Sequence, residues 1–109
     1  MKIIGFAGSP HKEGNTAWAV SQVLEGAADQ GAETRAWCFS GLTIQLCRGC
    51  LACHHGNQGC VIRDDMQPIY DALGQADALV FGTPVYMGQM SAQAKIFMGG
   101  SDWLFKKLV

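Results

Sequence analysis

The chain has 109 residues, a formal net charge of −1 and a hydrophobic fraction of 49%. This length suits one domain, and the lack of a basic run gives no reason to expect nucleic acid or an anionic membrane as a partner. Because the N-terminus lacks the long apolar segment of a signal peptide, and no stretch approaches the roughly 20 apolar residues of a membrane span, we expect a cytoplasmic protein.

The first part of the chain predicts a strand, a helix and a second strand. Residues 2–8, "KIIGFAG", form a short apolar run bounded by turn residues, which is typical of a buried strand. Apolar residues then recur at the spacing of a helix, for which Asn15 or Thr16 is the expected N-cap and Gly31 the expected end. Residues 32–39, "AETRAWCF", predict the second strand.

The second part predicts a helix, a strand and another helix. Residues 63–75, "RDDMQPIYDALGQ", show helical spacing of apolar residues, and residues 77–82, "DALVFG", predict a third buried strand. We expect Ser91 to cap the last helix, and we expect Gly99 and Gly100 to interrupt it.

Strands and helices that alternate in this way predict a single α/β domain over residues 1–109, with a parallel sheet between two layers of helices. Ligands of such sheets bind at the carboxyl ends of the strands. Residues 8–16 and 82–90 follow the first and third strands, so we expect them to form the site. A cysteine-rich loop, residues 47–60, interrupts the alternation.

Residues 8–16, "GSPHKEGNT", join the first strand to the first helix. A helix N-terminus presents unpaired N–H groups and partial positive charge, which suit a phosphate group. Ser9, Asn15 and Thr16 add side-chain donors, and His11 could add charge. An ordinary strand-to-helix turn is an equal alternative, because these residue types favour loops in any case.

Four of the five cysteines lie within residues 47–60, at the spacing C-x2-C-x2-C-x6-C. Three cysteines at x2 intervals are typical of [4Fe–4S] ligation, whereas structural zinc sites usually use two separated pairs. Zinc, with His54 or His55 as a possible ligand, and free thiols are the alternatives, while disulfides are rare in the cytosol. Cys38, in a predicted strand, is interpreted as a small buried residue. The expected cluster ligands are Cys47, Cys50, Cys53 and Cys60.

The motifs "GSPHKEGNT" and "GTPVYMGQMSAQAK" resemble the flavodoxin-like NADPH-dependent FMN reductase family, and the cysteine loop between them resembles its iron–sulfur flavoprotein branch. The resemblance runs from Met1 to about Phe97. It implies a three-layer αβα fold with a parallel sheet shortened to about three strands, in the order 2-1-3, with FMN as cofactor and NAD(P)H as a possible electron donor. The residues implied to hold the FMN phosphate are Ser9, His11, Asn15 and Thr16, and those implied to line the isoalloxazine ring are Thr83, Pro84, Val85, Tyr86, Met87 and Gly88.

The loop after the third strand also has features of its own that suit a flat ring. Pro84 and Gly88 favour a tight turn, and Tyr86 offers an aromatic face for stacking. The alternative is a hydrophobic loop that packs on a neighbouring subunit.

Two features depart from the family pattern. His11 stands where the family commonly has arginine, and it is a weaker, pH-dependent replacement. Chains of the family are longer and have five strands, so the third strand here, apolar on both faces, would lie at an edge that invites pairing. We expect a homo-oligomer, at least a dimer, to cover this edge; a partner polypeptide and a fragment of a longer protein are the alternatives.

The resemblance, together with the cysteine spacing, implies an FMN-dependent oxidoreductase. It would pass electrons from a small-molecule donor, NAD(P)H or a reduced carrier, to an acceptor such as a quinone or oxygen. No acid–base side chain is required, because the cofactors carry the chemistry. The alternative is a noncatalytic zinc- or metal-binding module, or a fragment, with an incomplete flavin site.

Overall fold

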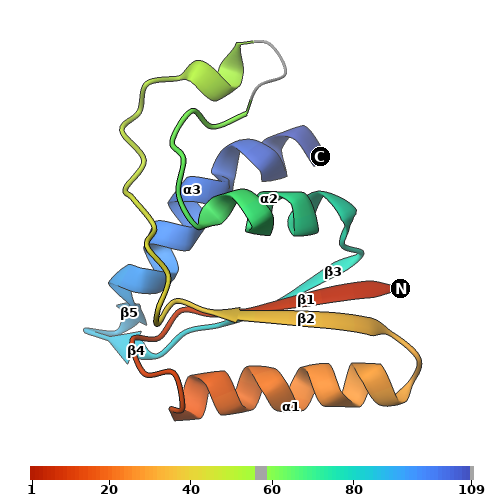
Figure 1. Cartoon of the computed structure of the whole chain (residues 1–109). Helices are drawn as coiled ribbons and strands as arrows, with labels where there is room; N and C mark the ends of the chain where they lie inside the picture. Colours follow the sequence, from red (N-terminus) through yellow and green to blue (C-terminus); the bar gives the residue numbers. More distant parts are fainter. Residues whose placement is uncertain (56–58, 109) are drawn as a thin grey trace.

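A sheet of three parallel strands forms the centre of the fold. The computed structural model describes residues 1–55 and 59–108. β1 (Lys2–Ala7) lies in the middle and pairs in parallel with β2 (Glu33–Cys38) on one side and β3 (Ala78–Gly82) on the other. The order β2-β1-β3 confirms the predicted flavodoxin-like arrangement, and each strand lies within the range that its apolar run predicts (Figure 1).

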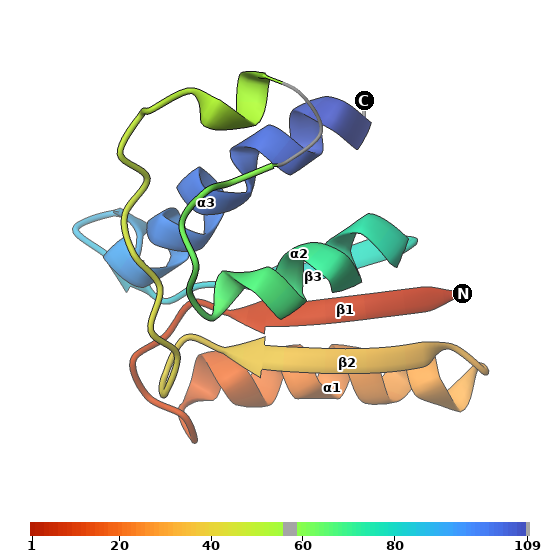
Figure 2. The ribbon, with the colours of Figure 1, turned by 45° about the horizontal axis from the view of Figure 1, so that its top comes forward.

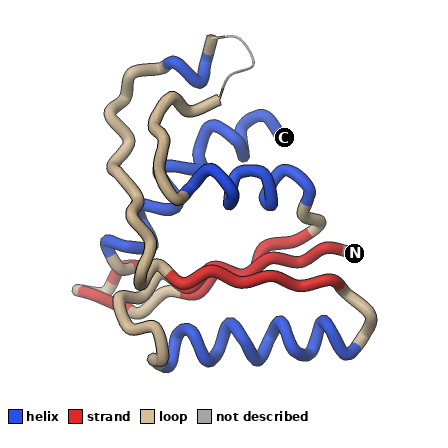
Figure 3. Tube along the Cα trace, in the orientation of Figure 1, coloured by secondary structure: helices blue, strands red, loops and turns tan. Residues whose placement is uncertain are grey.

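Helices cover both faces of this sheet. α1 (Asn15–Asp29) lies on one face, and α2 (Met66–Gln75) and α3 (Ala92–Leu108) lie on the other (Figure 1). The tube in Figure 3 shows the three layers, and the turned view in Figure 2 again places α2 and α3 on the side away from α1. None of the helices in the described part of the chain combines the length and the apolar character that crossing a bilayer requires.

The two ends of α1 differ in how well the sequence predicts them. Gly14, and not Asn15 or Thr16, is the N-cap, so the helix begins directly at Asn15. Gly14 holds this position because its N–H closes a turn onto the carbonyl oxygen of His11 at 3.2 Å. At the other end Gly31 has its predicted role, with a φ of 93° and an N–H that donates back to the last helical turn at 2.9 Å.

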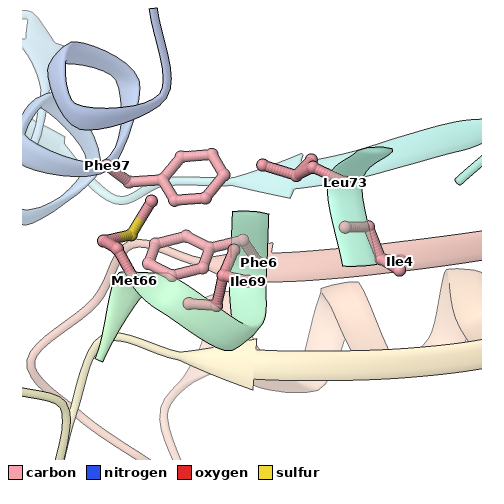
Figure 4. Close-up of a cluster of buried hydrophobic side chains, with 6 residues drawn as sticks. All are labelled: Ile4, Phe6, Met66, Ile69, Leu73 and Phe97. Atoms are coloured by element: carbon pink, nitrogen blue, oxygen red, sulfur yellow. The ribbon is translucent and has the colours of Figure 1, made fainter. Parts of the chain in front are cut away.

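The main core lies between the sheet and the α2–α3 layer. Phe6 of β1 and Phe97 of α3 stack with their ring centroids 4.0 Å apart and an angle of 16° between the rings. Burying a large apolar side chain contributes about 1.5–3 kcal/mol, so this cluster fixes both helices on the sheet. Figure 4 shows all six members of the cluster, which are Ile4, Phe6, Met66, Ile69, Leu73 and Phe97. A smaller cluster under α1 consists of Ala7, Val20 and Leu24.

α3 is continuous, so the predicted interruption at Gly99 and Gly100 is wrong. A glycine in a helix interior costs about 0.5–1 kcal/mol relative to alanine. Tertiary contacts outweigh that cost here. The hydroxyl of Tyr70 on α2 donates to the carbonyl oxygen of Gly100 at 2.8 Å, and the buried hydroxyl of Ser101 donates to a carbonyl oxygen one turn earlier at 2.7 Å.

The two edges of the sheet differ in charge. β2 carries Glu33 and Arg35, and the Arg35 guanidinium lies 4.3 Å from the centre of the Trp37 ring. β3 has the sequence ALVFG, without a charged residue. Charges on an edge strand discourage pairing with another chain, and an apolar edge invites it. The structure is of one chain, so the oligomer expected to cover β3 remains a prediction.

Candidate functional site

Two loops meet at the carboxyl end of the sheet. We name them for their predicted ligand: the phosphate loop is residues 8–14, after β1, and the ring loop is residues 83–91, after β3. The N–H of Gly8 donates to the carbonyl oxygen of Gly82 at 2.8 Å, and the hydroxyl of Ser91 donates to the carbonyl oxygen of Gly8. Hydrogen bonds therefore join the bases of the two loops.

Ser9 shapes the phosphate loop from within. Its side chain is buried, and its hydroxyl oxygen accepts the N–H of His11 at 3.1 Å. Its carbonyl oxygen lies 3.6 Å from the thiol of Cys38, which donates to it from the end of β2. Cys38 is half-buried and not fully buried as its strand position predicted, because it lies beside this loop. The side chain of His11 is exposed.

The first turn of α1 adds backbone donors to this loop. Among the described residues, no side chain caps the turn, so its N–H groups are uncapped at the positive end of a helix that is 15 residues long. Asn15 is exposed and Thr16 half-buried in the same turn. An open hollow of about 520 Å³ lies over residues 10–14, with Lys12 and Glu13 among the residues that line it. The N–H groups of the first turn of α1 fit a phosphate group, and the acidic Glu13 is the one residue of this lining that would oppose it.

The ring loop contains a hairpin that the sequence predicts only as a loop. β4 (Val85–Tyr86) pairs antiparallel with β5 (Gln89–Met90) through a turn of two residues, Met87 and Gly88. Their φ angles of 52° and 74° are typical of a type I′ turn, in which glycine is favoured. Gly88 therefore has its predicted role, and Pro84 lies just before the hairpin.

Side chains at the base and at the tip of this hairpin do different things. The hydroxyl of Thr83 donates to the carbonyl oxygen of the next residue at 2.8 Å and accepts the N–H of Ser91 at 3.0 Å. Thr83 thus holds the base of the hairpin. Val85, Tyr86 and Met87 are 75%, 43% and 100% exposed. All three are apolar side chains open to solvent in the loop that follows β3, and an exposed aromatic side chain such as that of Tyr86 suits contact with a flat ring.

We call residues 46–63 the cysteine segment. Hydrogen bonds to two carboxylates hold its two ends together. The N–H of Thr43 donates to the Asp65 carboxylate at 2.6 Å, and the N–H of Gln45 donates to the Asp64 carboxylate at 2.8 Å. The N–H of Asp65 donates in turn to the carbonyl oxygen of Thr43 at 3.1 Å. The two ends of the segment therefore lie side by side, and the segment extends from them away from the sheet (Figure 1).

Away from this base, the segment packs on α3 at Gly59. Gly59 is buried with a φ of 68°, and a Cβ atom there would lie 2.6 Å from Cη2 of Trp103. Trp103 packs edge-on against Tyr70, with ring centroids 5.2 Å apart and an angle of 70° between the rings. Burial raises the pKa of the Tyr70 hydroxyl above its ordinary value, so Tyr70 stays protonated as a donor. Both the backbone angle and the contact require glycine at position 59.

All four cysteines of the segment line one cavity of about 220 Å³, which Tyr70 and Trp103 bound on the side of the helices. Cys53 and Cys60 are half-buried. Cys47 and Cys50 are exposed. Nowhere in residues 1–55 and 59–108 do three His, Cys, Asp or Glu side chains come close enough together to hold a metal ion. Four thiols around one cavity are the donor type that an iron–sulfur cluster requires, although they are too far apart in this structure to bind one metal ion together.

Sequence reasoning missed two parts of this arrangement. Ser91 confirms its predicted role as a cap, because its Oγ accepts the N–H of Ala94 at 3.0 Å, but its bond to the phosphate loop was not expected. Tyr70 and Trp103 were not expected beside the cysteines. The sequence does contain a signal for Trp103: Gly100 and Trp103 lie about one turn apart on α3 and so share one face of this helix.

Comparisons with known proteins bear on this site. The chain matches the model of the NADPH-dependent FMN reductase family over residues 1–108. It is 39% identical over 98 residues to an iron-sulfur flavoprotein of Methanocaldococcus jannaschii, a match that covers 90% of this chain and 49% of that protein. It is 38% identical over 107 residues to an iron-sulfur flavoprotein of Methanosarcina thermophila, which covers 98% of this chain and 56% of that one. The chain thus spans about half the length of these curated relatives.

Proposed function

The chain belongs to the NADPH-dependent FMN reductase family, and on that basis we propose that it binds FMN at the carboxyl end of its sheet and acts as a flavin-dependent oxidoreductase. One observation carries this proposal. The phosphate loop and the ring loop, which are far apart in sequence, are hydrogen-bonded to each other through Gly8, Gly82 and Ser91. A single phosphorylated ring compound can therefore contact both.

Each part of the site would have its own task. The uncapped N–H groups of the first turn of α1 would bind the phosphate, with Asn15 and Thr16 as side-chain donors and His11 as a nearby imidazole. The exposed apolar hairpin, with Tyr86 at its centre, would pack against the isoalloxazine ring. Covering the ring in this way would exclude water from one face of it. Bound FMN supplies the electron transfer itself, as hydride or single electrons.

We also propose that Cys47, Cys50, Cys53 and Cys60 hold a [4Fe–4S] cluster. Their spacing, their position around one cavity and the names of the relatives support this. A cluster carries one electron at a time, so it would serve as a second electron carrier beside the flavin. His54 lines the same cavity and is the obvious alternative ligand if the metal is zinc.

The electron donor proposed is NAD(P)H or a reduced carrier, and the acceptor is a quinone, oxygen or another small molecule. The family supports a nicotinamide donor. In this electron transfer the chain would position the cofactor. The phosphate loop would hold the phosphate end of FMN, and the exposed side chains of Val85, Tyr86 and Met87 would contact its ring.

Anaerobic purification followed by flavin, iron, sulfide and zinc analysis tests both proposals. We expect FMN to bind saturably and about four iron atoms per chain, the content of one [4Fe–4S] cluster. A colourless protein with stoichiometric zinc and no affinity for FMN would instead support the noncatalytic metal-binding module. Oxidation of NAD(P)H by the FMN-loaded protein, followed by its absorbance, tests the donor separately.

A further inference from the structure

Ser91 joins three parts of the molecule, two of them through its hydroxyl and one through its backbone N–H. Its Oγ donates to the carbonyl oxygen of Gly8 in the phosphate loop and accepts the N–H of Ala94 in the first turn of α3 at 3.0 Å. The backbone N–H of Ser91 donates to the hydroxyl oxygen of Thr83, at the base of the hairpin, at 3.0 Å. We call Ser91, Thr83 and Gly8 the latch. Ser91 is 0% exposed, so it is shielded from direct contact with a ligand in this structure.

Close packing at Gly8 reinforces the latch. A Cβ atom on Gly8 would lie 2.6 Å from Cβ and 2.7 Å from Cα of Ala94. The start of the phosphate loop therefore rests directly on the backbone of α3. The position of this loop relative to the ring loop is thus set by the N-terminus of α3 as well as by the sheet.

We propose that Ser91 is a positioning residue that fixes the separation between the phosphate loop and the ring loop, so that one FMN molecule can contact both. This inference rests on the proposed binding of FMN. A ligand that spans two loops gains the full benefit of both contacts only if their separation is set in advance, because otherwise part of the binding energy is spent on ordering them. The latch therefore increases the gain in affinity that the phosphate group gives to FMN over the same ring without a phosphate.

Riboflavin provides the test, because it has the same ring as FMN and lacks the phosphate. The quantity to measure is the ratio of the riboflavin Kd to the FMN Kd, obtained by titrating the flavin-free protein. In Ser91→Ala we expect this ratio to fall about tenfold, the effect of losing one well-buried hydrogen bond. Contacts to the ring affect both ligands equally and cancel in the ratio.

Ser101→Ala is the matched control. Ser101 is also 0% exposed and lies within α3, whereas Ser91 is the residue just before this helix. The hydroxyl of Ser101 donates to the carbonyl oxygen of Phe97 at 2.7 Å, within the helix. We expect Ser101→Ala to lower the thermal midpoint as Ser91→Ala does, and to leave the ratio within about twofold of the original protein. If Ser91→Ala does not fold, Thr83 offers a second test. Thr83→Val removes the hydroxyl oxygen that accepts the N–H of Ser91, and Thr83→Ser keeps it. The Kd ratio should then fall in Thr83→Val and stay high in Thr83→Ser.

Equal losses of FMN and riboflavin affinity in Ser91→Ala would overturn the inference, and so would an equal fall of the ratio in Ser101→Ala. In both cases Ser91 has a merely structural role and the proposed FMN site stands. An unaltered protein that binds neither flavin contradicts the proposed function itself, and the inference falls with it.

Discussion

The ring loop and the cysteine segment both lie outside the central sheet, but the fold holds them in different ways. The ring loop is fastened at its base by buried or half-buried hydroxyls, those of Ser91 and Thr83, through hydrogen bonds at 3.0 Å. The cysteine segment is held at its base by Asp64 and Asp65 and rests on α3 at Gly59, and two of its thiols remain exposed.

The contacts of each region show this difference. Hydrogen bonds join the phosphate loop and the ring loop at their bases, so the fold itself sets the relative position of these two loops. The four cysteines line one cavity, and among the described residues they form no group close enough to hold a metal ion, so binding of the proposed cluster would draw them together and stabilise the segment. The experiments below break or sharpen this contrast, from the largest expected effect to the smallest.

Removing one thiol of the cysteine segment should affect iron binding and leave FMN binding unaffected. In Cys50→Ser we expect iron content to fall well below about four atoms per chain, because the proposed [4Fe–4S] cluster loses one of its four thiolate ligands, while FMN binding is retained. Iron and flavin analysis of the anaerobic protein measures both. Cys38→Ser is the control for iron content, since it alters a thiol in β2 that lies outside the segment, and the new hydroxyl can still donate to the carbonyl oxygen of Ser9. Loss of flavin along with iron in Cys50→Ser would show that the two regions are not independent.

Adding a methyl group at Gly8, at the start of the phosphate loop, should lower the free energy of unfolding. The new Cβ would lie 2.6 Å from Cβ of Ala94, and overpacking of this kind typically costs about 1–3 kcal/mol. Urea unfolding of Gly8→Ala measures the loss. Gly26→Ala, on α1 with no atom within 4 Å of the new Cβ, should instead stabilise the protein by about 0.5–1 kcal/mol. Similar effects of the two substitutions would contradict the close packing of Gly8 on α3.

A methyl group at Gly59 should loosen the cysteine segment and leave the sheet unaffected. Gly59→Ala meets both a positive φ and the Trp103 ring, whereas Gly49→Ala meets a positive φ of 67° with no atom within 4 Å. We expect about 1 kcal/mol of backbone strain in Gly49→Ala and a larger loss in Gly59→Ala. Hydrogen exchange in residues 46–63 measures it, and slow exchange that persists in Gly59→Ala would exclude this packing.

The smallest effect concerns the hydroxyl of Tyr70. Tyr70→Phe removes its bond to the carbonyl oxygen of Gly100 and keeps the ring beside Trp103, so we expect a loss of about 1 kcal/mol in the free energy of unfolding. Tyr86→Phe, on the exposed hairpin, should change stability by less than about 0.5 kcal/mol. If the two substitutions cost the same, the Tyr70 bond does not support the wall of the cysteine cavity.

The sequence predicts the sheet and the loops well because those signals are local. The runs "KIIGFA" and "ALVFG" are short and apolar and are bounded by turn residues, which favours buried strands. Gly31 and Ser91 are residue types that favour the end and the beginning of a helix. The carboxyl ends of parallel strands meet by geometry, which is why residues 8–16 and 82–90 could be paired in advance.

Tertiary contacts decide what the sequence does not reveal. Gly99 and Gly100 have poor helix propensity, but the Tyr70 hydroxyl and the packing of α3 on α2 keep the helix intact. The bond from Ser91 to Gly8 joins residues that are 83 positions apart, which no local pattern encodes. The cysteine spacing predicts four thiols that share one ligand, whereas the distances between these thiols depend on how the segment packs on α2 and α3.

The hydrogen bonds among Thr43, Gln45, Asp64 and Asp65 have a consequence for redesign of this protein. They hold the two ends of the segment together, and the entropy of closing a flexible loop between fixed ends depends only weakly on its length. Residues 46–63 can therefore be treated as a cassette, to be shortened to a plain turn or exchanged for another metal-binding sequence, while the strands and α2 on either side keep their register.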